Sequence, residues 1–273
     1  MSNKYQIYLI SDSTGETLDR IFLALQAQFL GFKYNSHQYA FTRTENQILK
    51  ILETCKKNKN SIILYTIVDS SLAKFLAENS KKENIPCFGV LGDLILNFSK
   101  LLNQKASHIP SGQHVLDEDY YKRIEAIQFT MNHDDGKDVE QIEKSDIVLL
   151  GVSRTSKTPT SVYLANRGFK TCNIPIVAEN SLPNKLTKNP KISCVVGLIT
   201  EAERLIEVRK NRMTLLKETE QSTYVNLEQI KKEIEISKNL FRKYNWPSID
   251  VTRKSVEEIA ASVIKIYDIM HSK

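Results

Sequence analysis

Short apolar runs alternate with segments of helical periodicity along the first hundred residues. Strands are predicted over 5–10, 61–68 and 85–91, and helices over 45–56 and 71–81. Another helix is predicted after the first strand, because apolar side chains recur there at helical spacing: Leu18, Ile21, Phe22, Leu25 and Phe29. The alternation of strand and helix predicts a parallel sheet with helices on its faces.

The second half repeats this alternation after a polar interruption. Residues 105–117 are polar and include Pro110 and Gly112, so we predict two domains, 1–105 and 106–273. Beyond them the pattern predicts a helix around 120–131, strands over 146–150, 174–177, 194–198 and 249–251, a helix over 160–166 and a last helix from 256. The predicted fold class is α/β, with an N-terminal parallel-sheet domain and a C-terminal domain resembling phosphate-loop folds.

Two pairs of residues have the spacing of a capping box at a helix start. They are Ser13 with Glu16, after the first strand, and Ser255 with Glu258, before the last helix. We therefore expect a side-chain cap at both places.

Composition narrows the classes of function only modestly. The 273 residues carry a net charge of +6, which favours anionic ligands but is too small to indicate nucleic-acid binding without a basic stripe and stacking aromatics. No run of about 18 apolar residues occurs and no secretory signal is visible at the start of the sequence, so we expect neither a membrane span nor secretion. Four scattered cysteines fit a reducing cytoplasm and argue against a zinc or disulfide framework.

The most informative motif follows the strand at 146–150. It consists of Gly151, Val152, Ser153, Arg154, Thr155, Ser156, Lys157 and Thr158. The motif matches the phosphate-loop pattern G-x-x-x-x-G-K-[ST] except that Ser156 replaces the second glycine, which narrows the backbone angles available there. Loop amides would bind phosphate oxygens, Lys157 would neutralise them and the hydroxyl of Thr158 would ligate Mg²⁺. A Ser/Thr-rich turn with a solvated lysine is the alternative.

Carboxylates supply the next candidates. Asp134 and Asp135, in a turn that ends a helix, could orient an acceptor hydroxyl, take its proton or help to hold Mg²⁺, although an ordinary polar turn has the same composition. His133 beside them could assist or simply cap the helix. Asp12 and Asp250 each end a strand, where ligands of open α/β sheets bind, and loop hydrogen bonding is their alternative role.

Two arginines fall on a predicted apolar helix face, which is formed by Leu205, Val208, Leu215 and Leu216. Arg209 and Arg212 would be costly to bury without partners, so we expect them to meet carboxylates, phosphates or an interface.

Several separate motifs in order give the chain a resemblance to a known family. They are LISDSTGET at 9–17, HDDG at 133–136, GVSRTSKTPTSVYLA at 151–165 and WPSIDVTRKSVEEIA at 246–260. Together they resemble the pyruvate, phosphate dikinase regulatory protein family over about residues 5–267. A sister branch, which regulates phosphoenolpyruvate synthase, more often has Cys-Gly where this chain has Thr155-Ser156.

The resemblance implies a bifunctional enzyme. It would use ADP to phosphorylate a threonine of pyruvate, phosphate dikinase, and inorganic phosphate to remove that group as pyrophosphate, with residues 151–158 as the ADP-binding segment. Three alternatives remain: the same chemistry on phosphoenolpyruvate synthase, a small-molecule kinase, and a non-catalytic regulator that senses a nucleotide. Whether the protein forms a homodimer is left open.

Overall fold

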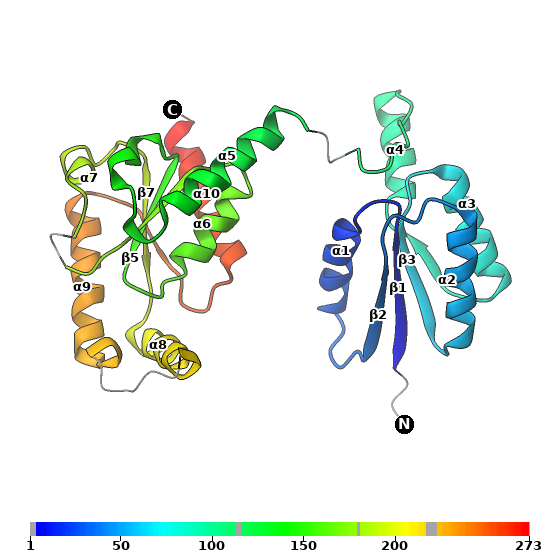
Figure 1. The fold of residues 1–273 in the computed structure, drawn as a ribbon, viewed down its shortest axis with the longest axis horizontal. Helices are drawn as coiled ribbons and strands as arrows, with labels where there is room; N and C mark the ends of the chain where they lie inside the picture. Colours follow the sequence, from blue (N-terminus) through cyan, green and yellow to red (C-terminus); the bar gives the residue numbers. More distant parts are fainter. Residues whose placement is uncertain (1–3, 113–115, 179–180, 217–222, 273) are drawn as a thin grey trace. The chain divides into compact units, whose positions relative to one another are not determined.

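The chain folds into two compact units, Met1–Val115 and Leu116–Lys273, so the division lies ten residues beyond the predicted boundary at 105 but within the polar stretch 105–117. The structure is a computed structural model that describes residues 4–112, 116–178, 181–216 and 223–272. Each unit is built on its own four-stranded parallel sheet, so the predicted α/β class is confirmed (Figure 1).

The N-terminal sheet has the strand order β2-β1-β3-β4. Its strands are β1 (Tyr5–Ser11), β2 (Tyr34–Tyr39), β3 (Ser61–Thr66) and β4 (Cys87–Gly89). The helices are α1 (Glu16–Gln26), α2 (Glu45–Lys57), α3 (Ser70–Lys82) and α4 (Gly92–Leu102). Helix α1 covers one face of this sheet and α2 and α3 cover the other, because alternate side chains of the central strands enter two separate cores.

Two features of this unit depart from the sequence predictions. Strand β2 was not predicted, because its sequence YNSHQY is polar. It lies at the edge of the sheet, where its side chains need not be apolar. The expected cap by Ser13 is wrong: α1 begins after Gly15, which has φ 86°, and no side chain caps its first turn.

The C-terminal sheet has the equivalent order β6-β5-β7-β8. Its strands are β5 (Ile147–Gly151), β6 (Thr171–Pro175), β7 (Cys194–Ile199) and β8 (Ser248–Asp250). The helices are α5 (Glu118–Asn132), α6 (Lys157–Ala165), α7 (Asn184–Lys188), α8 (Ala202–Leu216), α9 (Leu227–Lys243) and α10 (Val256–His271), with short 3-10 turns at Asp134–Gly136, Val139–Lys144 and Thr223–Val225. The capping box of Ser255 and Glu258 is confirmed.

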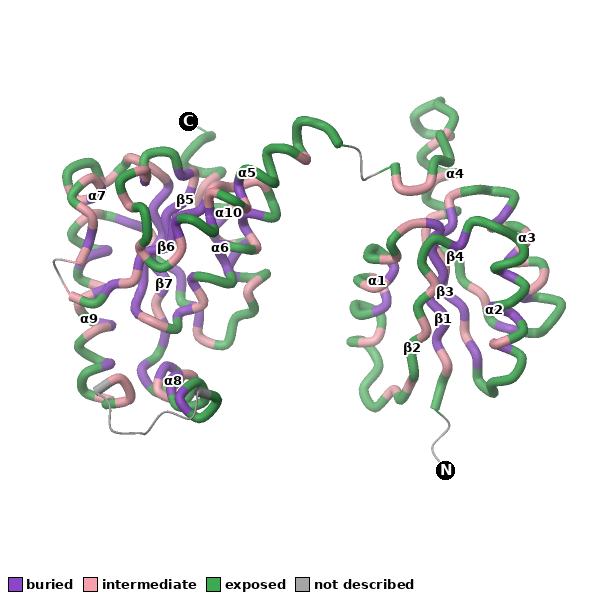
Figure 2. The backbone as a smooth tube through the Cα atoms, in the orientation of Figure 1, coloured by how far each residue is buried: buried purple, intermediate pink, exposed green. Residues whose placement is uncertain are grey.

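Strands β5 and β7 are buried almost throughout, and apolar cores lie on both faces of this sheet (Figure 2). A buried central strand β5 fixes the point at which the chain leaves the sheet, and the phosphate-loop motif starts there. All four cysteines are free thiols. None of the described helices combines the length and apolarity needed to cross a bilayer.

Candidate functional site

The segment 151–158 joins β5 to α6, as the sequence predicts. Gly151 is the last residue of β5, and a Cβ there would lie 2.7 Å from the carbonyl oxygen of Leu198 and 2.7 Å from Oγ1 of Thr155. Only glycine therefore fits between β7 and the returning loop. Thr155 is buried and donates to the carbonyl of Val152 at 2.9 Å, which closes the loop on itself.

Two residues of the loop have left-handed backbone angles. Arg154 has φ 75° and Ser156 has φ 60°. Ser156 thus occupies the conformation that the usual glycine would adopt, despite the steric cost of its Cβ. It is also the N-cap of α6 and makes no side-chain capping bond, so the first-turn amides and the positive end of the helix dipole are available to an anion.

Lys157 lies beneath this loop instead of extending into solvent. It is 6% exposed, and its ammonium donates to the carbonyl of Val152 at 3.0 Å. Burial lowers the pKa of Lys157 to about 8, although the carboxylates of Asp135 and Asp134 act in the opposite direction. The alternative of a solvated lysine is therefore excluded, and a desolvated ammonium beside phosphate-sized space is a strong anion partner.

The turn Asp134–Gly136 brings its carboxylates to the same loop. Asp134 Oδ1 accepts from the hydroxyl of Thr158 at 3.0 Å and from Nδ2 of Asn173, whose Oδ1 accepts from the amide of Asp135 at 3.0 Å. Asn173 lies in β6, is buried, and was not among the sequence candidates. Its polarity within an otherwise buried strand is the signal that could have found it, because a buried amide needs partners.

These groups surround one cavity of about 570 Å³. Its lining residues come from the carboxylate turn, the phosphate loop and α8: Asp134, Asp135, Ser153, Arg154, Ser156, Lys157, Thr158, Pro159, Val208 and Arg212. A space of this size accommodates a nucleotide-sized ligand. The structure thus brings the predicted carboxylates and most of the predicted loop together, while Gly151, Val152 and Thr155 shape the loop from behind.

Helix α8 is rotated from its predicted orientation. Its buried residues are Ala202, Leu205, Arg209 and Met213, whereas Leu215 is 83% exposed and the side chain of Leu216 lies outside the described residues. Arg212 is exposed and lines the cavity, so the prediction that it shares the apolar face is wrong.

Arg209 is instead a structural connection behind the loop. It is 1% exposed and donates to Glu233 at 2.7 Å, to the carbonyl of Tyr224 at 2.9 Å and to that of Ser153 at 3.3 Å. The hydroxyl of Tyr224, a residue that the sequence analysis missed, lies 3.1 Å from Nε of Arg154. One buried guanidinium therefore connects α8, α9 and the phosphate loop.

The residues present fit a magnesium ion only in part. Asp134 and Thr158 place a carboxylate and a hydroxyl on one wall of the cavity, and both are oxygen ligands that Mg²⁺ accepts. Within the described ranges, no group of three or more His, Cys, Asp or Glu side chains could enclose a metal. Such an ion would need phosphate oxygens and water for its remaining ligands.

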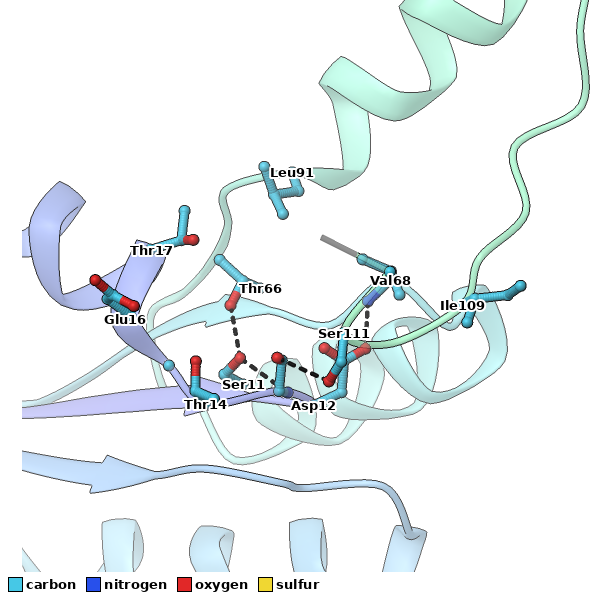
Figure 3. Close-up of a pocket in the computed structure, with 13 residues that line it drawn as sticks. Ser11, Asp12, Thr14, Glu16, Thr17, Thr66, Val68, Leu91, Ile109 and Ser111 are labelled. Carbon is cyan, nitrogen blue, oxygen red and sulfur yellow. Dashed lines mark hydrogen bonds between the residues drawn. The ribbon is translucent and has the colours of Figure 1, made fainter. Parts of the chain in front are cut away.

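The other strand-end carboxylates are not among the residues that line this cavity. Asp12 belongs to the N-terminal unit, is buried, and accepts from the amide of Val68 at 2.7 Å (Figure 3). Asp250 accepts from the amide of Thr252 at 2.8 Å, which is the loop role proposed as its alternative.

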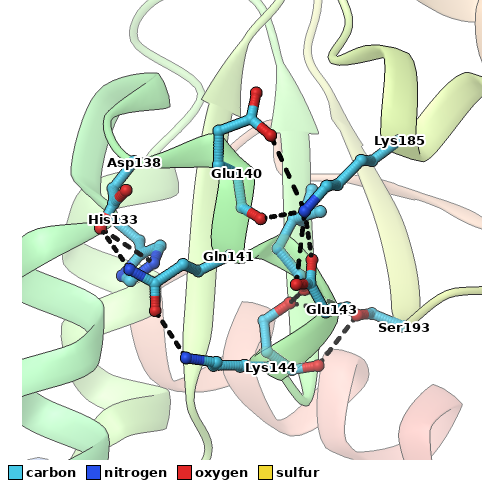
Figure 4. Close-up of polar contacts among 10 residues, drawn as sticks. His133, Asp138, Glu140, Gln141, Glu143, Lys144, Lys185 and Ser193 are labelled. Atoms are coloured by element: carbon cyan, nitrogen blue, oxygen red, sulfur yellow. Dashed lines mark hydrogen bonds and ion pairs between the residues drawn. The ribbon is translucent and has the colours of Figure 1, made fainter.

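His133 faces the short turns behind the site. Its Nδ1 lies 2.7 Å from the carbonyl of Phe129, and its Nε2 lies 3.9 Å from Asp138 (Figure 4). Lys185 forms a separate surface cluster there, with Glu143 at 3.2 Å. His133 does not line the cavity and ends α5.

Comparison with known proteins gives matches over nearly the whole chain. A family model described as kinase/pyrophosphorylase matches residues 7–264. A protein of Pelagibacter ubique (strain HTCC1062), named as a pyruvate, phosphate dikinase regulatory protein, is 69% identical over 269 residues, which cover 98% of each chain. A protein with the same name from Chelativorans sp. (strain BNC1) is 44% identical, and the match covers 96% of each chain. Another from Sphingopyxis alaskensis is also 44% identical, and the match covers 97% of this chain and 98% of that one.

Proposed function

This chain belongs to the kinase/pyrophosphorylase family, and from that premise we propose that it transfers phosphoryl groups to and from a threonine of pyruvate, phosphate dikinase. ADP would be the donor in the forward, inactivating reaction. Inorganic phosphate would be the acceptor in the reverse, reactivating reaction. The observation that carries the proposal is one cavity lined by the cations of Lys157 and Arg212 together with the carboxylate of Asp134.

In the kinase direction the threonine hydroxyl would attack the β-phosphorus of ADP, and AMP would leave. Asp134 or Asp135 would orient the hydroxyl and accept its proton. Lys157, Arg154 and the first-turn amides of α6 would neutralise charge on the transferring group, which is most of what phosphoryl transfer requires of a protein. Mg²⁺, held by Asp134 and Thr158, would supply further neutralisation.

In the reverse direction an oxygen of inorganic phosphate would attack the phosphothreonine. The phosphorus–threonine bond breaks, pyrophosphate leaves and the threonine oxygen recovers a proton. Both reactions move one phosphoryl group between a hydroxyl and a phosphate oxygen, so the same cations and carboxylate would serve each.

The test is transfer from ADP labelled at the β-phosphate, with pyruvate, phosphate dikinase and phosphoenolpyruvate synthase as parallel acceptors. We expect label on a dikinase threonine and little transfer from γ-labelled ATP. Label on the synthase would reassign the target, label on a metabolite would indicate a small-molecule kinase, and no covalent label would indicate a nucleotide-sensing binder. Lys157→Ala should nearly abolish the transfer, with Lys74→Ala on the exposed surface of α3 as a matched control.

A further inference from the structure

We propose that the N-terminal unit carries a second ligand site, for a phosphate monoester, at the carboxyl ends of β1 and β3. In the order β2-β1-β3-β4 the chain leaves β1 toward one edge of the sheet and returns to β3 on the other side, so these two strands flank the switch point of the topology. Ligands of open α/β sheets bind at the carboxyl ends of strands at such a point. This inference goes beyond the proposed phosphoryl transfer and does not depend on it.

A cavity of about 180 Å³ lies at this point (Figure 3). Hydroxyl groups dominate its polar lining: Ser11, Ser13, Thr14, Thr17, Thr66 and Ser111. Its volume is well below the roughly 300–1,000 Å³ of pockets for drug-sized ligands. It suits one phosphoryl group with a few further atoms, whereas a whole nucleotide would not fit.

One buried hydroxyl in the wall of this cavity has an unused hydrogen-bond donor. Ser11 is 3% exposed, and its Oγ accepts from the amide of Ser13 at 3.2 Å and from Oγ1 of Thr66 at 3.1 Å. Among the described residues its own O–H has no acceptor. A buried donor without a partner is uncommon, and a ligand oxygen in the cavity would supply the missing acceptor.

The start of α1 adds donors of the same kind. Its N-cap is Gly15, with φ 86° and no side-chain capping bond, so the first-turn amides and the helix dipole favour an anion. Ser156 before α6 has the same left-handed conformation at the equivalent place of the second sheet. The two units therefore present the same uncapped helix start at their switch points.

The charges around the cavity are mixed, with two carboxylates in its lining and one arginine beside it. The carboxylate of Asp12 is engaged by the amide of Val68, and Arg43 places a cation beside the cavity through its bond to Ser111 at 3.3 Å. Glu16 is the first residue of α1, where α6 has Lys157. Glu16 is exposed and its negative charge opposes anion binding, so neutralising it should tighten the binding of an anion.

The experiment measures binding of inorganic phosphate and of ribose 5-phosphate to the full-length protein by calorimetry. A Lys157→Ala background removes the lysine of the other cavity. We expect one saturable site, which Thr17→Val weakens at least about tenfold by removing a hydroxyl donor. Thr17→Ser, which keeps the hydroxyl, and Thr54→Val, a change on α2 outside the cavity, should stay within about twofold of the background. Glu16→Gln should tighten binding a few fold.

Three results would overturn the proposal: no saturable binding in this background, equal affinities of Thr17→Val and Thr17→Ser, or weaker binding by Glu16→Gln, which would contradict the repulsion expected between this carboxylate and a bound anion. Thr17 is exposed on the first turn of α1, so neither substitution should disturb folding. A preference for ribose 5-phosphate identifies an organic monoester, and equal affinities identify free phosphate. If Lys157→Ala leaves ADP binding unchanged, the proposed function fails while this site stands.

Discussion

Arg209 and Glu233 form a buried ion pair, 2.7 Å between guanidinium nitrogen and carboxylate oxygen, directly behind the phosphate loop. The same guanidinium donates to the carbonyls of Ser153 and Tyr224 and lies 4.5 Å from the centre of the Tyr224 ring. Arg212, only three residues along α8, has none of these partners and lines the cavity instead. The two arginines should therefore respond differently to the same substitution.

Arg209→Met should destabilise the protein by about 3–5 kcal/mol, because it leaves the half-buried carboxylate of Glu233 and the carbonyls of Ser153 and Tyr224 without their donor. Thermal and denaturant unfolding measure the loss. Glu233→Gln is the matched variant, and it should cost less, since Glu233 is more exposed than Arg209 and an amide oxygen can still accept the bond. Unchanged stability of Arg209→Met would mean that the pair is not formed in solution.

Arg212→Met should leave the stability nearly unchanged and weaken the binding of ADP or of inorganic phosphate. Methionine keeps the aliphatic bulk of the side chain. The lost charged hydrogen bonds correspond to about 1.5–3 kcal/mol, or roughly ten- to a hundredfold in affinity. Titrations of each ligand check this, with Arg242→Met on the exposed surface of α9 as the control. Wild-type affinity in Arg212→Met would remove this arginine from the site.

Lys157→Met should abolish transfer and at the same time stabilise the ligand-free protein at neutral pH. The folded-state pKa of about 8 lies below the unfolded value of 10.5, so the buried charge destabilises the fold below pH 8 by at most about 3 kcal/mol. That penalty fades as the pH rises from 8 to 10.5, because the folded lysine is already neutral there. Melting temperatures of variant and wild type should therefore converge above pH 10. A constant difference at all pH values would contradict the burial argument.

Asp134→Asn should reduce transfer by at least about a hundredfold, the lower end of what a positioned base supplies. Asp135→Asn tests the neighbouring carboxylate, and asparagine tolerates its φ of 56°. Because only the Asp134 carboxylate is bonded to Thr158 and Asn173, we expect Asp134→Asn to have the larger effect on rate. Single-turnover rates give the activity of each variant, and melting curves give its stability. Loss of stability with retained rate would make the pair structural.

Local sequence signals predicted much of this fold and the central part of its site. The strand, loop and helix around 151–158 follow from periodicity and from a motif within one segment of chain, and the N-terminal sheet was predicted as parallel. Partners from distant segments were not predictable in this way. Asn173 approaches Asp134 across 39 residues and Tyr224 approaches Arg154 across 70, and no periodicity within either segment records those contacts.

The orientation of α8 illustrates the same limit. Apolar spacing predicted a face that included both Arg209 and Arg212, but only Arg209 lies on the buried side, where Glu233 and two carbonyls satisfy its guanidinium. Periodicity along one helix does not record which of two arginines meets a carboxylate from another element, nor that Leu215 of the predicted face is exposed.

Ser156→Gly should stabilise the protein slightly by relieving the left-handed backbone at the start of α6. The left-handed conformation costs an L-residue with a Cβ roughly 1–2 kcal/mol, and glycine loses about 0.5–1 kcal/mol of stability through the larger entropy of its unfolded chain, so the expected gain is about 0–1.5 kcal/mol. Ser156→Ala keeps the Cβ and should gain nothing, so the pair separates backbone strain from the hydroxyl. Denaturant unfolding gives the stabilities, and ADP titration of both variants shows whether the hydroxyl contacts the nucleotide, in which case glycine and alanine weaken binding equally. Equal stability of the glycine and alanine variants would mean that Ser156 does not hold its φ of 60° in solution.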